Sequence, residues 1–369
     1  MIIGIPKEIK NHEYRVGATP GFVSLLVDAG HEVLVQSDAG AAIGYTDELY
    51  VNAGARIVPK LEDVYKADMV LKVKEPQKKE YPLMRKGQVI FCYYHLAAEP
   101  ELLKHLVEQQ VVAIAFETVV DEQGRLPLLT PMSEVAGRVA IQSGAWALQM
   151  ANGGKGLLLG GVPGVAPAKV IVIGGGVVGT HVARMAMGFG ADVTILERRL
   201  ARLRELDDLY GPQLKTIYST PVSIEEAVIV ADLVVGAVLI PGKRAPCLVT
   251  EEMVKKMQPG SVIVDVAIDQ GGCVETAHAT THSDPIYMKH GVVHYCVANM
   301  PGACARTSTQ ALTNAVAPYA MEIAEKGYVK ACKEMFGLKE GLNVCLGSVT
   351  NKPVAEDCGY DYVPPDKFL

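Results

Sequence analysis

The sequence predicts an α/β protein built from two doubly wound domains, and three observations support this prediction. Two successive series of Val- and Ile-rich runs alternate with amphipathic segments of helical period, a pattern typical of parallel sheets covered by helices. A glycine-rich stretch, 152–169, separates the two series. The chain has 369 residues, of which 49% are hydrophobic, so it can form more than one buried core.

Composition argues against several classes of partner. The formal net charge is −6, and no run of Lys and Arg has the length of a nucleic-acid or membrane-surface patch. The N-terminus lacks the pattern of a signal peptide, and Gly or Pro interrupts each long apolar stretch, so we expect no membrane span. The eight cysteines contain no CxxC pair, which favours reduced thiols and a cytoplasmic location.

The first series of runs predicts a sheet near the N-terminus. Amphipathic segments such as 21–30 and 99–110 lie between its strands and predict the covering helices. We expect strands at 2–6, 32–36, 69–74, 88–94 and 111–116.

The second series follows a predicted helix that begins near Thr130, with Thr as a good N-cap and Pro131 at the first helical position. Its runs are nearly continuous in Val and Ile, as expected for strands covered on both faces. Trp146 lies on this apolar helix, and we expect it in the core. A later helix over 307–327 contains Pro318 as an expected kink. The second set of strands is expected at 169–174, 192–197, 215–219, 232–238, 261–266 and 292–298.

A glycine turn at 174–179 carries the clearest chemical signal. Gly174, Gly176 and Gly179 match G-x-G-x-x-G, with Val177 and Val178 between the last two. The motif follows a predicted strand and opens a predicted helix, and a second strand ends at Glu197, 18 residues after Gly179. This context predicts a Rossmann dinucleotide-binding unit whose helix N-terminus receives the pyrophosphate.

Glu197 indicates which nicotinamide dinucleotide binds. An acid at this place accepts hydrogen bonds from the ribose hydroxyls and repels a 2′-phosphate, which favours NAD. Arg198 and Arg199 follow directly and could accept such a phosphate, so NADP stays open on the residues alone.

Four polar residues follow predicted strands, where ligands bind in open α/β sheets. Arg15, Lys74 and His95 belong to the first series, and Asp269 belongs to the second. If they face a cleft between the domains, Arg15 would pair with a carboxylate, Lys74 would hold a carbonyl oxygen, and His95 would act as general acid and base. Asp269 would handle the protons of an amine or carbinolamine. This set suits a small 2-oxo or 2-amino acid.

Each of these four residues also has a purely structural interpretation. Arg15 could be a surface charge and Lys74 an exposed lysine at a strand end. His95 could be a hydrogen-bonded core histidine, and Asp269 a loop cap.

Longer stretches resemble the L-alanine dehydrogenase family over essentially the whole chain. They are GIPKEIKNHEYRVGATP, VLKVKEP, HLAAEPEL, PLLTPMSEVAGR, GGVPGVAPAKVIVIGGGVVG, GAVLIPG, VIVDVAIDQGG and HYCVANMPGA. The resemblance implies reversible, NAD-dependent oxidative deamination of L-alanine to pyruvate and ammonium. It also implies a homohexamer and a substrate domain built from both chain ends. We therefore assign 1–129 and 304–369 to the substrate domain and 130–303 to the NAD domain.

The resemblance also assigns individual roles. Arg15 and Lys74 would bind the substrate, and His95 and Asp269 would be the catalytic pair. The NAD site would be lined by Ser133, Gly174, Gly176, Val177, Val178, Gly179, Glu197, Arg202, Ser219, Val238, Leu239, Val266, Ala267, Ile268, Asp269, Val297, Ala298, Asn299 and Met300. Two positions depart from the family pattern, with Glu197 where Asp is frequent and Ala305 where Pro is usual.

No metal is expected. His278 and His282, with Asp284 and His290 nearby, superficially resemble a ligand cluster, but the segment is rich in turn residues and does not present these rings on one helix face. We expect Cys273, Cys296 and Cys304 to be inert thiols.

Two other functions remain open on the residues. One is the soluble NAD(H)-binding part of a proton-translocating transhydrogenase, whose membrane segment a partner chain would supply. The other is a non-catalytic NAD-sensing protein on the same fold. The expected absence of a membrane segment and the retained Lys74, His95 and Asp269 count against the first, and the intact set of four polar residues counts against the second.

Overall fold

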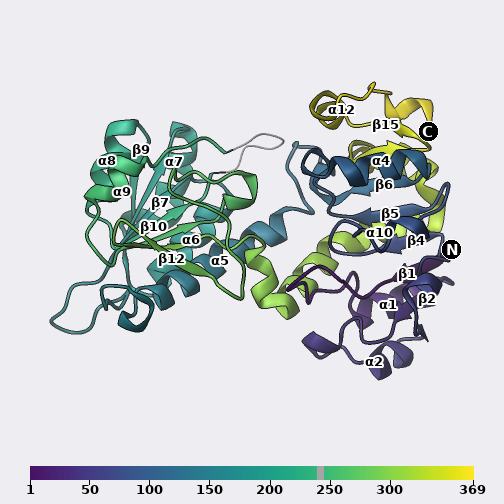
Figure 1. Cartoon of the computed structure of the whole chain (residues 1–369), viewed down its shortest axis with the longest axis horizontal. Helices are drawn as coiled ribbons and strands as arrows, with labels where there is room; N and C mark the ends of the chain where they lie inside the picture. Colours follow the sequence, from purple (N-terminus) through teal and green to yellow (C-terminus); the bar gives the residue numbers. More distant parts are fainter. Residues whose placement is uncertain (239–244) are drawn as a thin grey trace. The chain divides into compact units, whose positions relative to one another are not determined.

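The protein is described here from a computed structural model, which places residues 1–238 and 245–369. The chain forms two compact units. The first contains Met1–Met132 and Ala305–Leu369, and the second contains Ser133–Cys304. Each unit has one twisted sheet with helices on both faces (Figure 1).

The sheet of the first unit has eight strands in the order β15-β14-β6-β5-β4-β1-β2-β3. The six strands from the N-terminal part of the chain pair in parallel. The strands of this sheet are β1 (Ile2–Ile5), β2 (Glu32–Gln36), β3 (Arg56–Val58), β4 (Met69–Leu71), β5 (Val89–Cys92), β6 (Val112–Ala115), β14 (Leu342–Cys345) and β15 (Ser348–Val349).

The C-terminal segment completes this sheet. β14 pairs antiparallel with β6, and β15 continues the sheet antiparallel to β14. Tyr362 then bridges Val349 in parallel, so the tail covers the outer edge of the short strand β15. Covering an edge in this way removes a template for pairing with other chains.

The sheet of the second unit has seven strands in the order β12-β13-β11-β10-β7-β8-β9. It is parallel except for β12, which pairs antiparallel with β13 at one edge. Its strands are β7 (Lys169–Ile173), β8 (Asp192–Glu197), β9 (Leu214–Tyr218), β10 (Leu233–Gly236), β11 (Val262–Asp265), β12 (Ile286–Lys289) and β13 (Val292–Tyr295).

Helices surround both sheets because their apolar faces cover strands that are buried on both sides. β5, β6, β10 and β11 are fully buried along their length. The α-helices are α1 (Pro20–Asp28), α2 (Asp47–Asn52), α3 (Leu61–Val64), α4 (Pro100–Glu108), α5 (Thr130–Ala147), α6 (Val177–Gly188), α7 (Leu200–Tyr210), α8 (Pro221–Ile229), α9 (Glu251–Lys256), α10 (Ala305–Glu334), α11 (Phe336–Gly341) and α12 (Lys352–Cys358).

Three local predictions were wrong. The interruption in α10 falls at Gly327, whose φ of 72° only glycine adopts at little cost, and Pro318 lies within the helix. Thr130 is itself helical, and its hydroxyl donates to the Leu126 carbonyl at 2.9 Å instead of capping the helix. Trp146 lies in the last turn of α5 with 40% of its surface exposed, so it is not a core residue.

The predicted strands are confirmed, but several end earlier than expected. β4 ends at Leu71, β5 ends at Cys92 and β11 ends at Asp265. Lys74, His95 and Asp269 therefore lie in the loops beyond these strands, where backbone is free to shape a site.

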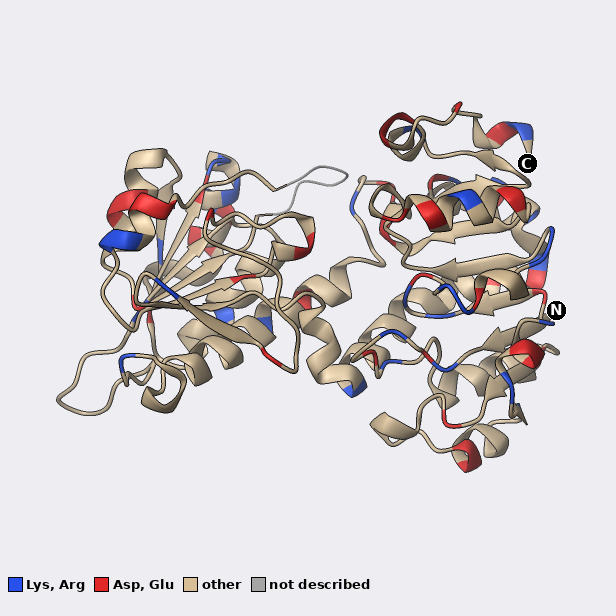
Figure 2. Ribbon diagram, viewed as in Figure 1, with Lys and Arg blue, Asp and Glu red and all other residues tan. Residues whose placement is uncertain are grey.

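Basic and acidic residues are interspersed along the ribbon of both units (Figure 2), in agreement with the small net charge. Among the described residues, no helix has both the length and the apolar character needed to cross a bilayer.

Candidate active site

The glycine turn has the predicted geometry, with β7 ending at Ile173 and α6 beginning at Val177. Gly174 has a φ of 107°, which requires glycine. A Cβ on Gly179 would lie 1.8 Å from the Gly174 carbonyl oxygen, so only glycine fits there. A Cβ on Gly176 would meet nothing within 4 Å, so the protein itself does not require glycine at this position. Space left open in front of a helix N-terminus fits the pyrophosphate of a dinucleotide.

Glu197 is the last residue of β8, and its side chain hydrogen-bonds the backbone of this turn. Its Oε2 accepts the N–H of Gly175 at 2.9 Å, and its Oε1 accepts the N–H of Arg199 at 2.9 Å. Burial tends to raise the pKa of Glu197, but the hydrogen bonds from Arg199 and Gly175 outweigh it and hold the pKa below its ordinary value. Glu197 is therefore an anion at neutral pH, as the ribose-binding role requires.

Arg202 also holds the turn. Its Nε donates to the Gly175 carbonyl at 2.8 Å, and its Nη2 donates to the Thr180 hydroxyl at 2.8 Å. Thr180 in turn donates to the Gly176 carbonyl at 2.8 Å. The sequence analysis did not single out Thr180, although a hydroxyl in the first turn after a glycine motif is a usable signal for such a bond.

The resemblance assigns further residues to the NAD site, and some of them lie near the same strand ends. The Ser219 N–H bonds the Glu197 carbonyl at 3.1 Å, and Val238 Cγ2 lies 3.0 Å from the Cβ position of Gly174. Asn299 has a left-handed backbone with φ of 69°, between Val297, which bridges Thr280, and the buried Met300. Ser133 lies in the first turn of α5. Leu239 lies outside the described residues.

Asp269 lies on a 3-10 turn, Ile268–Gln270, beyond β11. It is exposed, and its carboxylate has no hydrogen bond or ion pair among residues 1–238 and 245–369. The structure therefore does not support the interpretation of Asp269 as a loop cap. Asp265, at the end of the strand, is the carboxylate that bonds the loop backbone.

Arg15 is not a surface charge, because only 2% of its surface is exposed. Its Nε and Nη2 form a two-point pair with the Glu13 carboxylate at 2.7 and 2.5 Å. Its Nη1 contacts the Met132 sulfur at 3.1 Å, a weak acceptor. The loop that carries Arg15 crosses β4 so closely that a Cβ on Gly17 would lie 2.3 Å from the Leu71 carbonyl oxygen.

Lys74 is half-buried beyond β4. Burial lowers the pKa of Lys74, and the nearby Arg15 charge lowers it further. Within the described part of the chain, its ammonium makes no hydrogen bond or ion pair. A lysine with a lowered pKa and an unused ammonium group is typical of a functional site.

Glu8 holds the backbone of this segment. Its Oε1 accepts the N–H of Val73 at 2.6 Å and the N–H of Lys74 at 3.2 Å. Its Oε2 lies 3.5 Å from the Nζ of Lys72, which also bonds Glu80 at 2.9 Å. Burial raises the pKa of Glu8 to about 7, against the opposing effect of the Lys72 ammonium. The sequence analysis missed this fully buried cluster.

His95 is 44% exposed and is therefore not a core histidine. Its backbone is left-handed, with φ of 51°, and its N–H donates to Glu117 Oε1 at 2.6 Å. The imidazole Nδ1 lies 3.9 Å from the same oxygen. The ring is parallel to the Tyr93 ring, with an interplanar angle of 2° and centroids 6.1 Å apart.

The structure thus brings three of the four polar residues into one neighbourhood. The Arg15 charge acts on the pKa of both Lys74 and Tyr93, and Tyr93 is parallel to His95. Asp269 belongs to the other unit.

The histidines of the discounted cluster make separate contacts. His278 stacks on Tyr287, His282 contacts the Asn299 carbonyl at 3.1 Å, and His290 pairs with Glu251 at 2.5 Å. Among the described residues, no group of three or more His, Cys, Asp or Glu side chains is placed to hold a metal ion. Burial raises the pKa values of Cys273 and Cys296, which keeps these thiols protonated.

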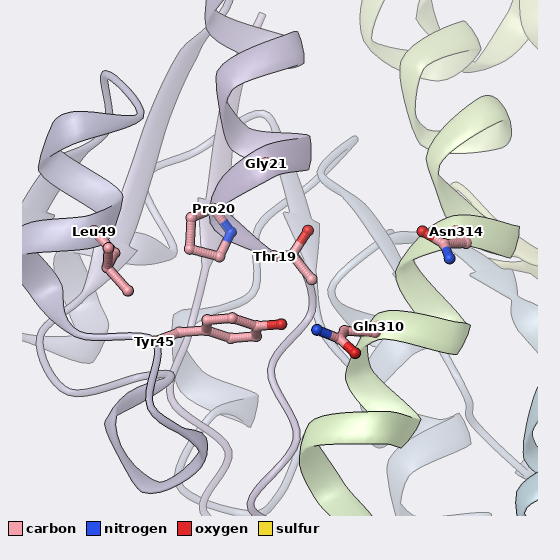
Figure 3. A pocket seen from close by; sticks show the side chains of 7 residues that line it. All are labelled: Thr19, Pro20, Gly21, Tyr45, Leu49, Gln310 and Asn314. Atoms are coloured by element: carbon pink, nitrogen blue, oxygen red, sulfur yellow. The ribbon is translucent and has the colours of Figure 1, made fainter.

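A surface pocket of about 520 Å³ lies in the first unit beside α1 and α10 (Figure 3). Tyr45 points across it toward Gln310, and Asn314 lies one turn further along α10. Its lining includes none of the candidate site residues, so we do not assign it to the reaction.

The second unit has a glycine turn that fits a dinucleotide, and the first unit has an arginine, a lysine with a lowered pKa and an accessible histidine. Together they define the class of two-domain, nicotinamide-dependent oxidoreductases. Two family models match the chain, alanine dehydrogenase/PNT N-terminal domain over residues 4–136 and alanine dehydrogenase/PNT C-terminal domain over residues 140–352. The chain belongs to the alanine dehydrogenase/PNT family.

Similar proteins support this assignment. The chain is 61% identical to alanine dehydrogenase of Bacillus subtilis, over 100% of the chain and 98% of that protein. It is 54% identical to alanine dehydrogenase of Methanococcus maripaludis over the full length of both. A solved L-alanine dehydrogenase matches with a TM-score of 0.94 and 51% identity over 97% of this chain and 99% of that one. A transhydrogenase from Sinorhizobium meliloti matches with a TM-score of 0.83 and 26% identity over 95% of this chain and 100% of that one.

Proposed function

We propose that this protein catalyses the NAD-dependent oxidative deamination of L-alanine to pyruvate and ammonium, and the reverse reaction. The observation that carries the proposal is the identity of 61% to an alanine dehydrogenase along the whole chain. This chain also has all four polar residues of the candidate site.

Arg15 and Lys74 are assigned to substrate binding. Glu13 pairs with the Nε and Nη2 atoms of Arg15. The proposal has the same guanidinium bind the alanine carboxylate through charge-assisted hydrogen bonds. Lys74 would donate to the carbonyl oxygen of pyruvate. Its lowered pKa makes the ammonium a better proton donor to that oxygen than an ordinary lysine.

His95 and Asp269 are assigned to proton transfer. In the oxidative direction, NAD held by the glycine turn would supply the acceptor for the hydride from the alanine Cα. His95 takes a proton as the amine becomes an imine, and water then adds to form a carbinolamine. His95 and Asp269 move the protons that let ammonium leave. The balance is one alanine, one NAD⁺ and one water consumed, with one pyruvate, one ammonium, one NADH and one proton formed.

NAD would be held by the glycine turn and the residues bound to it. The open space at Gly176 and the anionic Glu197 fit the pyrophosphate and the ribose hydroxyls. Arg199 bonds Glu197 and is thereby drawn away from a 2′-phosphate, which supports NAD over NADP.

Three further parts of the proposal concern organisation. The substrate domain is assigned to 1–129 and 304–369, and the NAD domain to 130–303. We also propose a homohexamer, as the family resemblance implies. Several large apolar side chains of the second unit, such as Met150 and Leu158, are exposed, which supports self-association. A cytoplasmic location is supported by the eight cysteines, which are all free thiols.

The purified protein tests the activity directly. With L-alanine and NAD at alkaline pH, we expect NADH absorbance to rise, and pyruvate with ammonium and NADH should consume it. A screen of small L-amino acids with NAD and NADP in parallel measures the specificity. Hydride exchange between NADH and NADP without turnover of alanine would instead favour the transhydrogenase alternative.

A further inference from the structure

Asp265 stands apart from the residues assigned above because it is completely buried and has no cation beside it. Its exposed fraction is 0%, and it has no ion pair among residues 1–238 and 245–369. Its oxygens instead accept three backbone N–H groups, from Ala267 at 3.0 Å, Cys273 at 2.8 Å and Val274 at 3.1 Å.

These three donors lie at the two ends of one loop. Ala267 begins the loop beyond β11, and Cys273 and Val274 end it. Between them the backbone bonds itself, from Gln270 N–H to the Ala267 carbonyl at 2.9 Å and from Gly272 N–H to the same carbonyl at 3.0 Å. Asp269 is exposed at the centre of this closed loop.

Two glycines leave room for the carboxylate. A Cβ on Gly236 would lie 2.3 Å from the Cys273 sulfur and 3.2 Å from Asp265 Oδ1. A Cβ on Gly272 would lie 2.8 Å from Asp265 Oδ2. The end of the neighbouring strand β10 and the loop itself are thus shaped around this side chain.

A carboxylate is costly in this place. Burial raises the pKa of Asp265, although the three N–H donors oppose that change. A carboxylate is nevertheless the group that suits the arrangement, since it accepts on both oxygens and carries no donor. An amide of the same shape would turn its NH₂ group toward backbone N–H donors at one end of the loop, and the hydrogen bonds to that end would be lost.

We propose that Asp265 is a positioning residue, which closes the 266–274 loop from both ends and thereby fixes Asp269 for proton transfer. This inference rests on the proposed function, which assigns Asp269 to the reaction. Asp265 itself touches neither substrate nor NAD in this scheme.

The test compares Asp265→Asn with a matched variant, Asp232→Asn. Asp232 also accepts a backbone N–H, from Lys169 at 2.7 Å, and pairs with Lys155, but it precedes β10 and so lies at the opposite end of the strands from Asp265. We expect Asp265→Asn to lower kcat about 10- to 100-fold, because a shift of about 1 Å in a reacting group has effects of this size. The KM for alanine should stay within roughly twofold, since substrate binding is assigned to the other unit. Asp232→Asn should keep kcat within roughly twofold of the wild type.

Amide hydrogen exchange gives a readout that does not depend on turnover. In the wild type, the amides of Ala267, Cys273 and Val274 should be protected, and Asp265→Asn should speed exchange across 266–274 while β7 and β8 remain protected. The wild-type measurement holds even if the variant folds poorly. Unprotected amides at these three positions in the wild type would overturn the proposal.

A double-mutant cycle separates this inference from the proposed function. In an Asp269→Asn background, Asp265→Asn should lower the residual kcat by no more than roughly twofold, because the residue that it positions is already disabled. An undiminished effect in that background would overturn the proposal. An inactive Asp269→Asn with an unimpaired Asp265→Asn would overturn the positioning role alone. Wild-type activity in Asp269→Asn would overturn the assignment of Asp269, and this inference with it.

Discussion

Glu117 Oε1 accepts the backbone N–H of His95 at 2.6 Å and lies 3.9 Å from the Nδ1 of the same residue. One carboxylate thus stabilises the left-handed backbone of His95 and lies beside its ring. Glu8 and Asp265 act similarly on the segments that carry Lys74 and Asp269. Each of these three candidate site residues lies in a loop whose backbone is bound by a buried or half-buried carboxylate.

Replacement of His95 by alanine tests its proposed role as general acid and base. We expect kcat to fall about 100- to 10,000-fold, the usual contribution of a positioned acid–base group, with little change in Tm because 44% of the side-chain surface is exposed. His105→Gln, on α4 of the same unit, serves as the matched control and should keep full activity. A His95→Ala enzyme with near wild-type kcat would contradict the assignment of His95 to proton transfer.

Two substitutions at Glu117 separate hydrogen bonding from charge. Glu117→Gln keeps an oxygen that can accept from the backbone, whereas Glu117→Ala leaves the N–H groups of Tyr94 and His95 without this acceptor. We expect the alanine variant to lose about 1–3 kcal/mol of unfolding free energy and more activity than the glutamine variant. Urea unfolding and kcat, measured on both, check this order. Equal losses in the two variants would contradict it.

The buried Glu8 should make stability depend on pH. Its pKa is raised to about 7 in the folded protein from an ordinary value of 4.5, mainly by burial and against the attraction of Lys72. Between these values the folded state holds a proton that the unfolded state has released, so this contribution to stability falls as pH rises through this window and is constant above it.

Glu8→Gln removes this titration. Urea unfolding of both proteins from pH 4 to 8 should show the wild type losing stability relative to the variant as pH approaches about 7. Parallel curves over the whole range would show that Glu8 does not titrate in this way.

Two glycines of the dinucleotide turn should respond differently to alanine. In Gly179→Ala the new methyl group would lie 1.8 Å from the Gly174 carbonyl oxygen. We therefore expect the free energy of unfolding to fall by about 1–3 kcal/mol. In Gly176→Ala the methyl group would meet no protein atom within 4 Å, so Tm should be unchanged. It would occupy the space proposed for the pyrophosphate, and NADH affinity, measured by fluorescence, should fall about tenfold or more. Normal affinity in Gly176→Ala would place the pyrophosphate elsewhere.

Glu197→Gln should shift the preference between cofactors. The variant loses the charge that repels a 2′-phosphate and weakens the hold on Arg199, so kcat/KM with NADP should rise relative to NAD, by roughly tenfold. The double variant Glu197→Gln/Arg199→Ala should lose this gain. An unchanged ratio of kcat/KM with NADP to kcat/KM with NAD in the single variant would mean that Glu197 does not contact the ribose.

Much of the fold follows from the sequence because the central strands are continuous runs of Val and Ile, such as Val170 to Ile173 and Val262 to Val264. The strands β3, β12, β14 and β15 were not predicted. They are short and lie at or near sheet edges, where fewer contacts constrain the residues and the apolar pattern is weak. Trp146 illustrates a related failure, because an apolar helix does not specify which side of its last turn faces the core.

The polar residues of the site were predicted from their places after strands, but the groups that hold them were not. Glu8 bonds residues 65 and 66 positions away, and Glu117 bonds residues 22 and 23 positions away. Such bonds depend on which strands become neighbours, and spacing along the chain does not encode that. Asp265 was included in a predicted strand, where nothing distinguished its carboxylate from a surface acid.

The pairing of β14 with β6 has a consequence for how the protein is made. Leu342 pairs with Ile114, so the sheet of the first unit needs a strand that leaves the ribosome long after β6. The whole of Ser133–Cys304 is translated before that strand exists, and the middle of the chain can complete its own sheet first. Until then β6 has an open edge, and a nascent or truncated chain that stops before residue 342 would expose it to other chains.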